Sequence, residues 1–341
     1  MNNYLVTLHL FLLLVFTVSS VNATQDDPLL FDDTPLPLSE SLETPTWFKL
    51  SFLDLQDSLN EATNAGKAGM IIYFGRKDCA YCKAQLEVNW GSKDITNYTR
   101  QHFDVIGIDV RGQRTVTDFD GKTYTEKDYS SHTKTNFTPT LHFYNTSGQL
   151  VLNLRGYRPP YQFRAALEFV ADAHYLREPF RDYLARAEAA MGFGLDEMNE
   201  HDAFLPPPYN LDRSKQAAKN PLVVFFEHPR CHACDVLHAG PLSEPELNTS
   251  IYNLEAVQLD ITSDTLVITP EGKKTTARNW ARDLDLSFAP TLIFFDEEGK
   301  EIIRIDSVVR LYRLSNVLLY VLSKGYKKYP NFQIWREQTR R

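Results

Sequence analysis

The chain has 341 residues, of which 43% are hydrophobic, 12% aromatic and 23% charged. This composition is typical of a globular protein, and the length allows two domains of ordinary size. The 36 Lys and Arg against 44 Asp and Glu give a formal net charge of −8, which argues against a nucleic-acid partner. Only four cysteines are present, too few for a disulfide-stabilised scaffold, so we expect them to serve chemistry or local constraints.

Residues 1–23 have the pattern of an export signal. The apolar stretch LVTLHLFLLLVF is short for a membrane span, and Ala23 offers a small residue at the expected cleavage point. The preceding MNNY lacks Lys and Arg, so an uncleaved membrane anchor is the alternative. In either case we expect the bulk of the protein outside the cytosol, where disulfides persist. Residues 24–45 follow as a polar lead-in punctuated by prolines.

The rest of the chain contains one pattern twice. An apolar run precedes a Cys-x-x-Cys pair in both halves, as MIIYFGRKDCAYC in the first and LVVFFEHPRCHAC in the second. The spacing repeats as well, because Cys79 and Pro139 are 60 residues apart and Cys231 and Pro290 are 59 apart. We therefore predict two copies of one domain, about 150 residues apart.

Each copy is predicted to run helix, strand, Cys-x-x-Cys at the start of a helix, strand, helix, proline-led strand, glycine turn, strand and closing helix. That order predicts an α/β fold in which a mixed sheet is flanked by helices. We place the first domain at residues 46–191 and the second at 213–330. A linker with three consecutive prolines joins them at 192–212, and residues 331–341 are expected to form a solvated basic tail.

The positions of the cysteines predict thiol–disulfide exchange. A cysteine in the first turn of a helix lies beside unpaired backbone N–H groups that stabilise its thiolate and make it a nucleophile. A cysteine three residues further on lies on the same helical face, close enough to attack a mixed disulfide. Cys79 and Cys231 are therefore the predicted attacking residues, and Cys82 and Cys234 the resolving ones.

Each half resembles the thioredoxin superfamily over nearly its full length. One shared feature is the order of strand, Cys-x-x-Cys and helix, and the other is a proline that opens a later strand, in FTPTLHFY and FAPTLIFF. The resemblance implies that Pro139 and Pro290 are cis and that Thr138 and Ala289 present their backbone to an extended substrate. The sequence is similar to exported Dsb-type and SoxW-like thioredoxins, which implies a periplasmic thiol–disulfide oxidoreductase of the reductase or isomerase type.

Other residues near the cysteines differ from thioredoxin or between the copies. Tyr73 and Phe225 stand where thioredoxin has a buried aspartate, six residues before the first cysteine. Tyr81, within CAYC, is expected on an exposed helix start where it contacts substrate. His232, within CHAC, is expected beside the substrate and, when charged, would stabilise the Cys231 thiolate.

Two other interpretations of the cysteines are a zinc site and an inert structural disulfide. The pairs of a zinc ribbon are about 15 to 20 residues apart, far closer than these two pairs. A metal held by Cys231, Cys234, His228 and His232 would be strained, so no metal is expected. An inert structural disulfide is the second interpretation, although so small a ring restrains the unfolded chain little.

The expected substrates are protein or peptide thiols and disulfides, and an unidentified redox partner would reset the cysteine pairs. No cofactor and no nucleic acid are expected. The alternative function is a peptide-binding, chaperone-like protein in which redox chemistry is secondary. The sequence leaves the direction of electron flow open.

Overall fold

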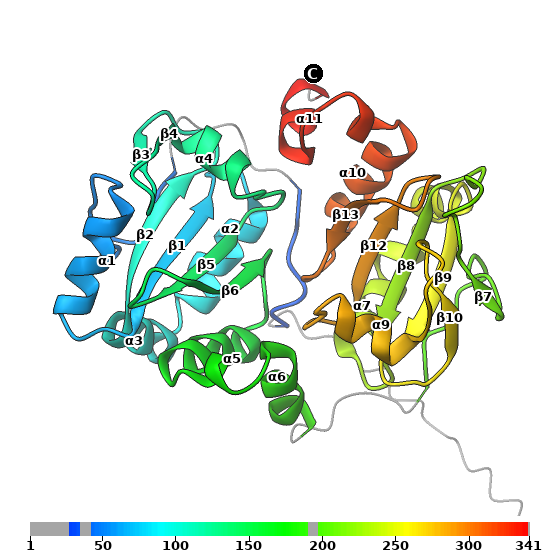
Figure 1. The fold of residues 1–341 in the computed structure, drawn as a ribbon, viewed down its shortest axis with the longest axis horizontal. Coiled ribbons are helices and arrows are strands. Elements are labelled where there is room, and N and C mark those ends of the chain that lie inside the picture. The colour runs from blue at the N-terminus through cyan, green and yellow to red at the C-terminus, as the bar shows by residue number, and fades with distance from the viewer. Residues whose placement is uncertain (1–26, 35–41, 190–196, 340–341) are drawn as a thin grey trace, which may run out of the picture.

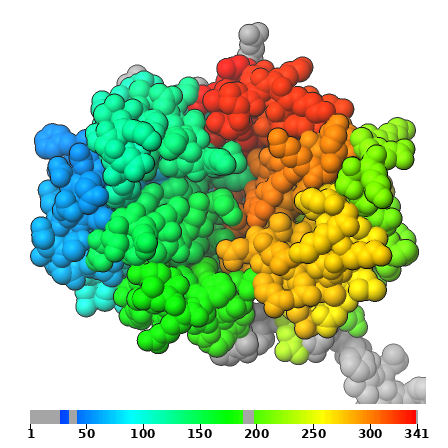
Figure 2. All heavy atoms as spheres, in the orientation of Figure 1, coloured from blue at the N-terminus to red at the C-terminus, as the bar shows by residue number. Residues whose placement is uncertain are grey.

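The computed structural model describes residues 27–34, 42–189 and 197–339. It contains two α/β domains, coloured from blue to green and from yellow-green to red in Figure 1. The space-filling view shows that the two domains touch along their shared side (Figure 2). The predicted fold class, two tandem domains with mixed sheets flanked by helices, is confirmed.

The first domain is built on a four-stranded sheet in the order β2-β1-β5-β6. β1 and β2 are parallel, whereas β5 is antiparallel to both of its neighbours. Every residue of β1 is buried, because helices cover both faces of the sheet. The elements are α1 (Leu55–Asn64), β1 (Gly69–Gly75), α2 (Ala80–Ala84), the π-helical turn η1 (Gln85–Asn89), α3 (Lys93–His102), β2 (Phe103–Asp109), β3 (Thr115–Thr117), β4 (Thr123–Thr125), α4 (Glu126–His132), β5 (Thr140–Asn145), β6 (Leu150–Arg155), α5 (Pro160–Ala171), η2 (His174–Leu176) and α6 (Phe180–Ala189).

The second domain repeats this sheet in the order β9-β8-β12-β13, with the same strand directions. Its central strand, β8, is likewise buried throughout. The elements are β7 (Tyr209–Asn210), β8 (Leu222–Glu227), α7 (His232–Ala239), η3 (Pro241–Ser243), α8 (Pro245–Ile251), β9 (Glu255–Asp260), β10 (Leu266–Ile268), β11 (Lys274–Thr276), α9 (Ala277–Asp283), β12 (Thr291–Phe295), β13 (Glu301–Ile305), α10 (Leu311–Leu322), η4 (Gly325–Lys327) and α11 (Phe332–Thr339).

The prediction of a helix at the start of the second copy is wrong. Residues 211–221 contain no helix, and β7 just before them pairs in parallel with β10. Between Leu211 and Pro221 the sequence has no large apolar side chain. A helix there would have no apolar face to bury, so it would gain nothing from packing on the sheet.

Part of the N-terminal lead-in lies between the domains. Residues 27–34 form the dark-blue segment at the centre of Figure 1. Leu29 is buried in the core of the first domain, and Phe31 packs edge-on against Tyr81 and Tyr157. Asp33 is buried as well. The expectation of a simple lead-in is therefore wrong for these residues, which become part of the domain interface.

The linker is also partly structured. β7 belongs to a small sheet with β10 and β11, and Leu211 is buried in the core of the second domain. Phe204 packs against Phe225, with ring centroids 5.0 Å apart. The three consecutive prolines, residues 206–208, are exposed, as expected of a linker.

The expectation of a solvated tail is wrong for residues 332–339, which form α11. Phe332 and Trp335 are buried in the core of the second domain. They lie on one face because residues three apart on a helix are neighbours, and the basic residues around them hide this apolar face in the sequence. On another side of α11, Glu337 pairs with Arg111 of the first domain at 3.2 Å.

The two domains meet around equivalent residues. Arg155 and Asp306 occupy the same position in the two copies, 151 residues apart, and form an ion pair at 2.7 Å. The next residues, Gly156 and Ser307, are so close that a Cβ on Gly156 would clash with the Ser307 hydroxyl. The interface thus has an approximate two-fold axis at the ends of β6 and β13. Under this relation, α5 and α6 correspond to α10 and α11.

The predicted export signal, residues 1–23, lies outside the described residues. Within residues 27–34, 42–189 and 197–339, no helix has the length and apolar character that crossing a membrane requires.

Candidate active site

The first cysteine pair lies where β1 leads into α2. Cys79 is the N-cap of α2, and its Sγ accepts a hydrogen bond from the backbone N–H of Cys82 at 3.1 Å. The hydroxyl of Thr138 donates a second hydrogen bond to the same sulfur at 3.2 Å. The two cysteines form a disulfide. After reduction the same donors would face a thiolate, and such hydrogen bonds stabilise the charged form of the sulfur.

The second pair repeats this geometry. Cys231 is the N-cap of α7, and the backbone N–H of Cys234 donates to its Sγ at 3.1 Å. These two cysteines also form a disulfide. The helix-start positions predicted for Cys79 and Cys231 are thus observed, and their chemical roles stay predictions.

A proline faces each disulfide from a neighbouring strand. Pro139 and Pro290 immediately precede β5 and β12, which pair with β1 and β8. The Thr138–Pro139 and Ala289–Pro290 peptide bonds are both cis. The preceding residues differ, because the Thr138 carbonyl accepts a hydrogen bond from Arg313 at 3.1 Å. By contrast, the peptide N–H and C=O of Ala289 have no hydrogen-bond partner among the described residues.

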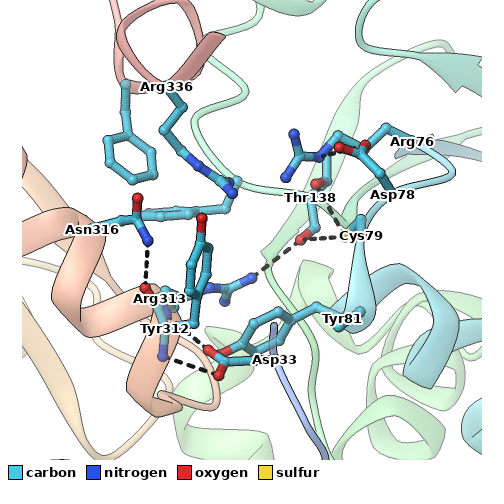
Figure 3. A pocket seen from close by; sticks show the side chains of 13 residues that line it. Asp33, Arg76, Asp78, Cys79, Tyr81, Thr138, Tyr312, Arg313, Asn316 and Arg336 are labelled. Atoms are coloured by element: carbon cyan, nitrogen blue, oxygen red, sulfur yellow. Dashed lines mark hydrogen bonds and ion pairs between the residues drawn. The ribbon is translucent and has the colours of Figure 1, made fainter. Parts of the chain in front are cut away.

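Side chains from three separate parts of the chain close the first site. Arg313, on α10 of the second domain, places its guanidinium 3.5 Å from the centre of the Tyr81 ring. The Tyr81 hydroxyl donates to the Asp33 carboxylate at 2.9 Å. Asp33 also accepts hydrogen bonds from the backbone N–H groups of Tyr312 and Arg313, so it caps the N-terminus of α10 (Figure 3).

Burial around this contact is nearly complete. Tyr81 is 5% exposed and Arg313 is 7% exposed. Burial raises the pKa of Tyr81 and lowers the pKa of the Arg313 guanidinium. The free volume beside Cys79 is about 30 Å³, room for one or two water molecules. The expectation that Tyr81 lies exposed is wrong, because the second domain and residues 27–34 cover it.

The second site opens into a cavity between the domains. Its volume is about 530 Å³, which is within the usual range of ligand sites. Cys231, His232 and Ala289 line it on the side of the second domain. The opposite wall comes from α5 and α6 of the first domain and includes Tyr161 and Gln162. The sequence-predicted residues His232 and Ala289 are therefore brought together with Cys231.

His232 joins the N-terminal segment to the second site. Its Nε2 lies 2.8 Å from the carboxylate of Asp27, and its side chain is about half exposed. Residues 27–34 thus contact both sites, through Asp27 at the second and through Asp33 at the first.

Neither copy has an acid at the position where thioredoxin has a buried aspartate. Tyr73 is fully buried, and burial raises the pKa of its hydroxyl. Phe225 is part of the core of the second domain. Glu227 is buried closer to the second pair, but it pairs with His238 of α7 at 3.0 Å and accepts a hydrogen bond from Gln258 at 2.9 Å. In the described part of the chain, no group of three His, Cys, Asp or Glu side chains is arranged to hold a metal.

Sequence reasoning missed Asp33, Arg313 and Gln162. Nothing local marks Asp33, because its backbone partners on α10 are 279 and 280 residues further along the chain. A signal for the other two was present in the repeat. Arg313 and Gln162 are at equivalent positions, 151 residues apart, and they differ in size and charge.

The sheet order, the helix-capping disulfides and the facing prolines define a protein of two α/β domains with a Cys-x-x-Cys pair in each. The sequence profile of the thioredoxin-like domain matches residues 55–171 and 208–322, which is more than half of the chain. The chain therefore belongs to the thioredoxin-like domain family, with two tandem copies, and the resemblance seen in the sequence is confirmed.

Several solved structures are similar to part of this chain. A thioredoxin-fold protein from Helicobacter pylori is 25% identical with a TM-score of 0.30, over 35% of this chain and 80% of its own. A thioredoxin from Thermus thermophilus is 20% identical with a TM-score of 0.25, over 31% and 76%. A DsbH oxidoreductase is 12% identical with a TM-score of 0.27, over 40% and 95%. A comparison with curated proteins gives no match.

Proposed function

We propose that the protein is a thiol–disulfide oxidoreductase of the reductase or isomerase type, which acts on exported polypeptides through its Cys-x-x-Cys pairs. The main support is the placement of Cys231, which caps α7 at the edge of the interdomain cavity, beside a peptide group of Ala289 that has no hydrogen-bond partner within residues 27–34, 42–189 and 197–339. An extended polypeptide that pairs with this peptide group would bring its own sulfur close to Cys231.

The proposed reaction has two balanced steps. In the reduced protein, the Cys231 thiolate attacks a substrate disulfide, forms a mixed disulfide and releases one substrate thiolate, which takes up a proton from water. The Cys234 thiolate then attacks the Cys231 sulfur and releases the second substrate thiolate. This step restores the Cys231–Cys234 disulfide, so the substrate has gained two electrons. An external dithiol, the proposed redox partner, returns two electrons to the pair.

Export to a bacterial periplasm is part of the proposal. It is supported by the short apolar stretch LVTLHLFLLLVF and by Ala23, a small residue at the expected cleavage point after it. It is also consistent with a chemistry that depends on disulfides, which persist outside the cytosol.

Trapping in cells tests the proposed reaction. A Cys234→Ser variant should accumulate mixed disulfides through Cys231, because the resolving thiol is missing. The matched control is Cys231→Ser/Cys234→Ser, which cannot form them at this site. The wild-type protein should also catalyse the reduction of insulin by dithiothreitol. If no partner is trapped and insulin reduction is not accelerated, the proposal is wrong.

The lining of the cavity favours one second function, a peptide-binding protein in which redox chemistry is secondary. Leu184, Leu286 and Phe288 give the cavity an apolar surface that would hold the side chains of an unfolded segment. Replacing all four cysteines by serine separates the two functions. If the protein without cysteines still supports the phenotype of the wild-type host cell, peptide binding is the main function.

A further inference from the structure

We infer that Arg313 is a specificity-determining residue that keeps extended polypeptides away from the Cys79–Cys82 pair and so makes Cys231–Cys234 the polypeptide site. The inference rests on the proposed function, because it assigns the substrates of that function to one of the two pairs.

The closing helices of each domain form a wall of the other domain's site. Tyr312 and Arg313 of α10 line the space beside Cys79. Tyr161 and Gln162 of α5 line the cavity beside Cys231, and they occupy the equivalent positions in the first copy. Equivalent closing helices therefore flank both disulfides, and the N-terminal segment completes each lining with different residues, Asp33 at the first site and Asp27 at the second. The difference in free volume, about 30 Å³ against about 530 Å³, has to come largely from individual side chains.

Two pairs of equivalent residues explain this difference. At the first site, the Arg313 guanidinium stacks on the Tyr81 ring and fills the space between the domains. At the second site, the equivalent residues are Gln162 and Ala233. Glutamine is shorter than arginine and uncharged, and alanine offers no ring for a cation to stack on. A third pair has the same trend, since Arg336 beside the first site corresponds to Ala185 beside the second.

Arg313 also occupies the backbone group that a polypeptide would need. Its Nη2 donates to the Thr138 carbonyl at 3.1 Å, whereas the equivalent peptide group of Ala289 has no hydrogen-bond partner in the part of the chain that the structure describes. Arg313 is held in place by a hydrogen bond from its Nη1 to the Ser307 hydroxyl at 2.9 Å. A substrate strand would have to displace the Arg313 guanidinium before it could pair with Thr138 at the first site. This displacement costs free energy, because the guanidinium would lose its favourable contacts with the Tyr81 ring and the Thr138 carbonyl.

Full-length proteins with a single cysteine pair test this inference. Cys231→Ser/Cys234→Ser keeps only the first pair, and Cys79→Ser/Cys82→Ser keeps only the second. Each oxidised protein is reduced by a synthetic extended peptide that carries a Cys-x-x-Cys dithiol and, separately, by dithiothreitol as a small dithiol. We expect the ratio of peptide rate to dithiothreitol rate to be about tenfold lower for the first pair, the effect of displacing one hydrogen bond to a charged donor.

Exchanging the equivalent wall residues sharpens the test. Arg313→Gln in the protein with the first pair should raise this ratio by about tenfold, and Gln162→Arg in the protein with the second pair should lower it. Arg164→Gln is the control, because the side chain of this partly exposed arginine bonds to Glu168 within α5 and lines neither site. It should change the ratio by less than about twofold.

The outcomes separate the inference from the proposed function. Equal ratios for the two pairs, or an unchanged ratio in a folded Arg313→Gln protein, overturn the inference and leave the function standing. Circular dichroism shows whether Arg313→Gln folds. If it does not fold, the inference is still tested by the two single-pair proteins with unchanged Arg313 and Gln162, and by the Gln162→Arg protein. If neither pair exchanges with the peptide or with dithiothreitol, the proposed function itself is wrong.

Discussion

The Cys79 and Cys231 sites share a helix start, a disulfide and a facing proline, yet their surroundings differ. The first has about 30 Å³ of free space and the second about 530 Å³. The helix start is the same at both sites, with a backbone N–H 3.1 Å from the Sγ of each first cysteine, and only Cys79 also accepts a hydrogen bond from a threonine hydroxyl, that of Thr138 at 3.2 Å. The free volume beside each disulfide therefore depends on side chains from the neighbouring domain, whereas the geometry of the helix start is produced within each copy.

Breaking the ion pair between Arg155 and Asp306 should have the largest effect on stability and on the difference in accessibility between Cys79 and Cys231. Burial opposes ionisation of Asp306, but the charge of Arg155 and its hydrogen bond keep the Asp306 pKa below its usual value. Arg155→Met would leave this carboxylate buried without its partner. We expect a loss of about 3 kcal/mol in the free energy of unfolding, the lower end for a broken buried pair because Arg155 is partly exposed.

Urea unfolding followed by circular dichroism measures this loss, and alkylation of the reduced protein shows whether Cys79 becomes as accessible as Cys231. The charge-swapped protein Arg155→Asp/Asp306→Arg is the control and should recover most of the stability. A single Arg155→Met variant with wild-type stability and alkylation rates would argue against the role of this pair.

The cores of the two domains should respond differently to acid. His142 in β5 is buried where the second copy has Ile293 in β12. Burial, together with the charge of Arg155, lowers the pKa of His142 from 6.5 to about 4. As the pH falls below 6.5, the unfolded chain binds a proton that the folded chain excludes. Stability is therefore complete above pH 6.5 and falls until the pH reaches about 4, with a loss of about 2 kcal/mol at pH 5.

His142→Ile gives the first domain the residue of the second and should remove this part of the pH dependence. Hydrogen exchange of the β5 amides, followed by mass spectrometry at pH 7 and pH 5, measures it, with the β12 amides as the internal reference. If the variant and the wild type lose the same stability between these pH values, His142 is not the group responsible.

Removing the Asp33 carboxylate, which bonds residues 27–34 to Tyr81 and to α10, should have a smaller effect on stability and on the accessibility of Cys79. Asp33→Ala removes the acceptor for the Tyr81 hydroxyl and for two backbone N–H groups of α10. We expect a loss of about 1.5 kcal/mol in stability and faster alkylation of reduced Cys79. Asp32→Ala is the matched control, because this exposed neighbour bonds only locally to Thr34. Equal alkylation rates in the two variants would contradict the prediction.

The smallest effect concerns the reduction potential of the second site. His232→Ala places at this position the residue that the first site has at Ala80. When protonated, His232 would place a positive charge beside the Cys231 thiolate and favour the reduced form, so its removal should lower the potential of the pair by about 20 mV. Equilibration with a glutathione buffer measures the potential of the protein that keeps only this pair. An unchanged or higher potential would show that His232 does not stabilise the thiolate.

Features that depend on short stretches of sequence could be predicted. The buried strands β1 and β8 follow from continuous apolar runs, and the helix starts at Cys79 and Cys231 follow from the residues after them. Pro139 and Pro290 could be placed because each precedes a second apolar run. These features are local, so a single pattern is enough to locate them.

Features that depend on the packing of distant segments could not be predicted. Tyr81 is buried only because α10 and residues 27–34 cover it, and no local pattern indicates that cover. The burial of α11 is hidden by its charges, because Phe332 and Trp335 form an apolar face only when the segment is helical. The second copy lacks its first helix for a different reason, because residues 212–220 do not carry the apolar side chains that strict repetition of the first copy would require.

The contact between Arg155 and Asp306 also bears on self-association. In a symmetric dimer of identical chains, each residue on the two-fold axis meets its own copy, so an arginine there would face an arginine. Two molecules of this protein that paired through like halves would bring together two Arg155 or two Asp306 side chains, and close like charges disfavour such a contact. A chain that carries both halves can put opposite charges on its own axis, which selects its second half as the partner of its first.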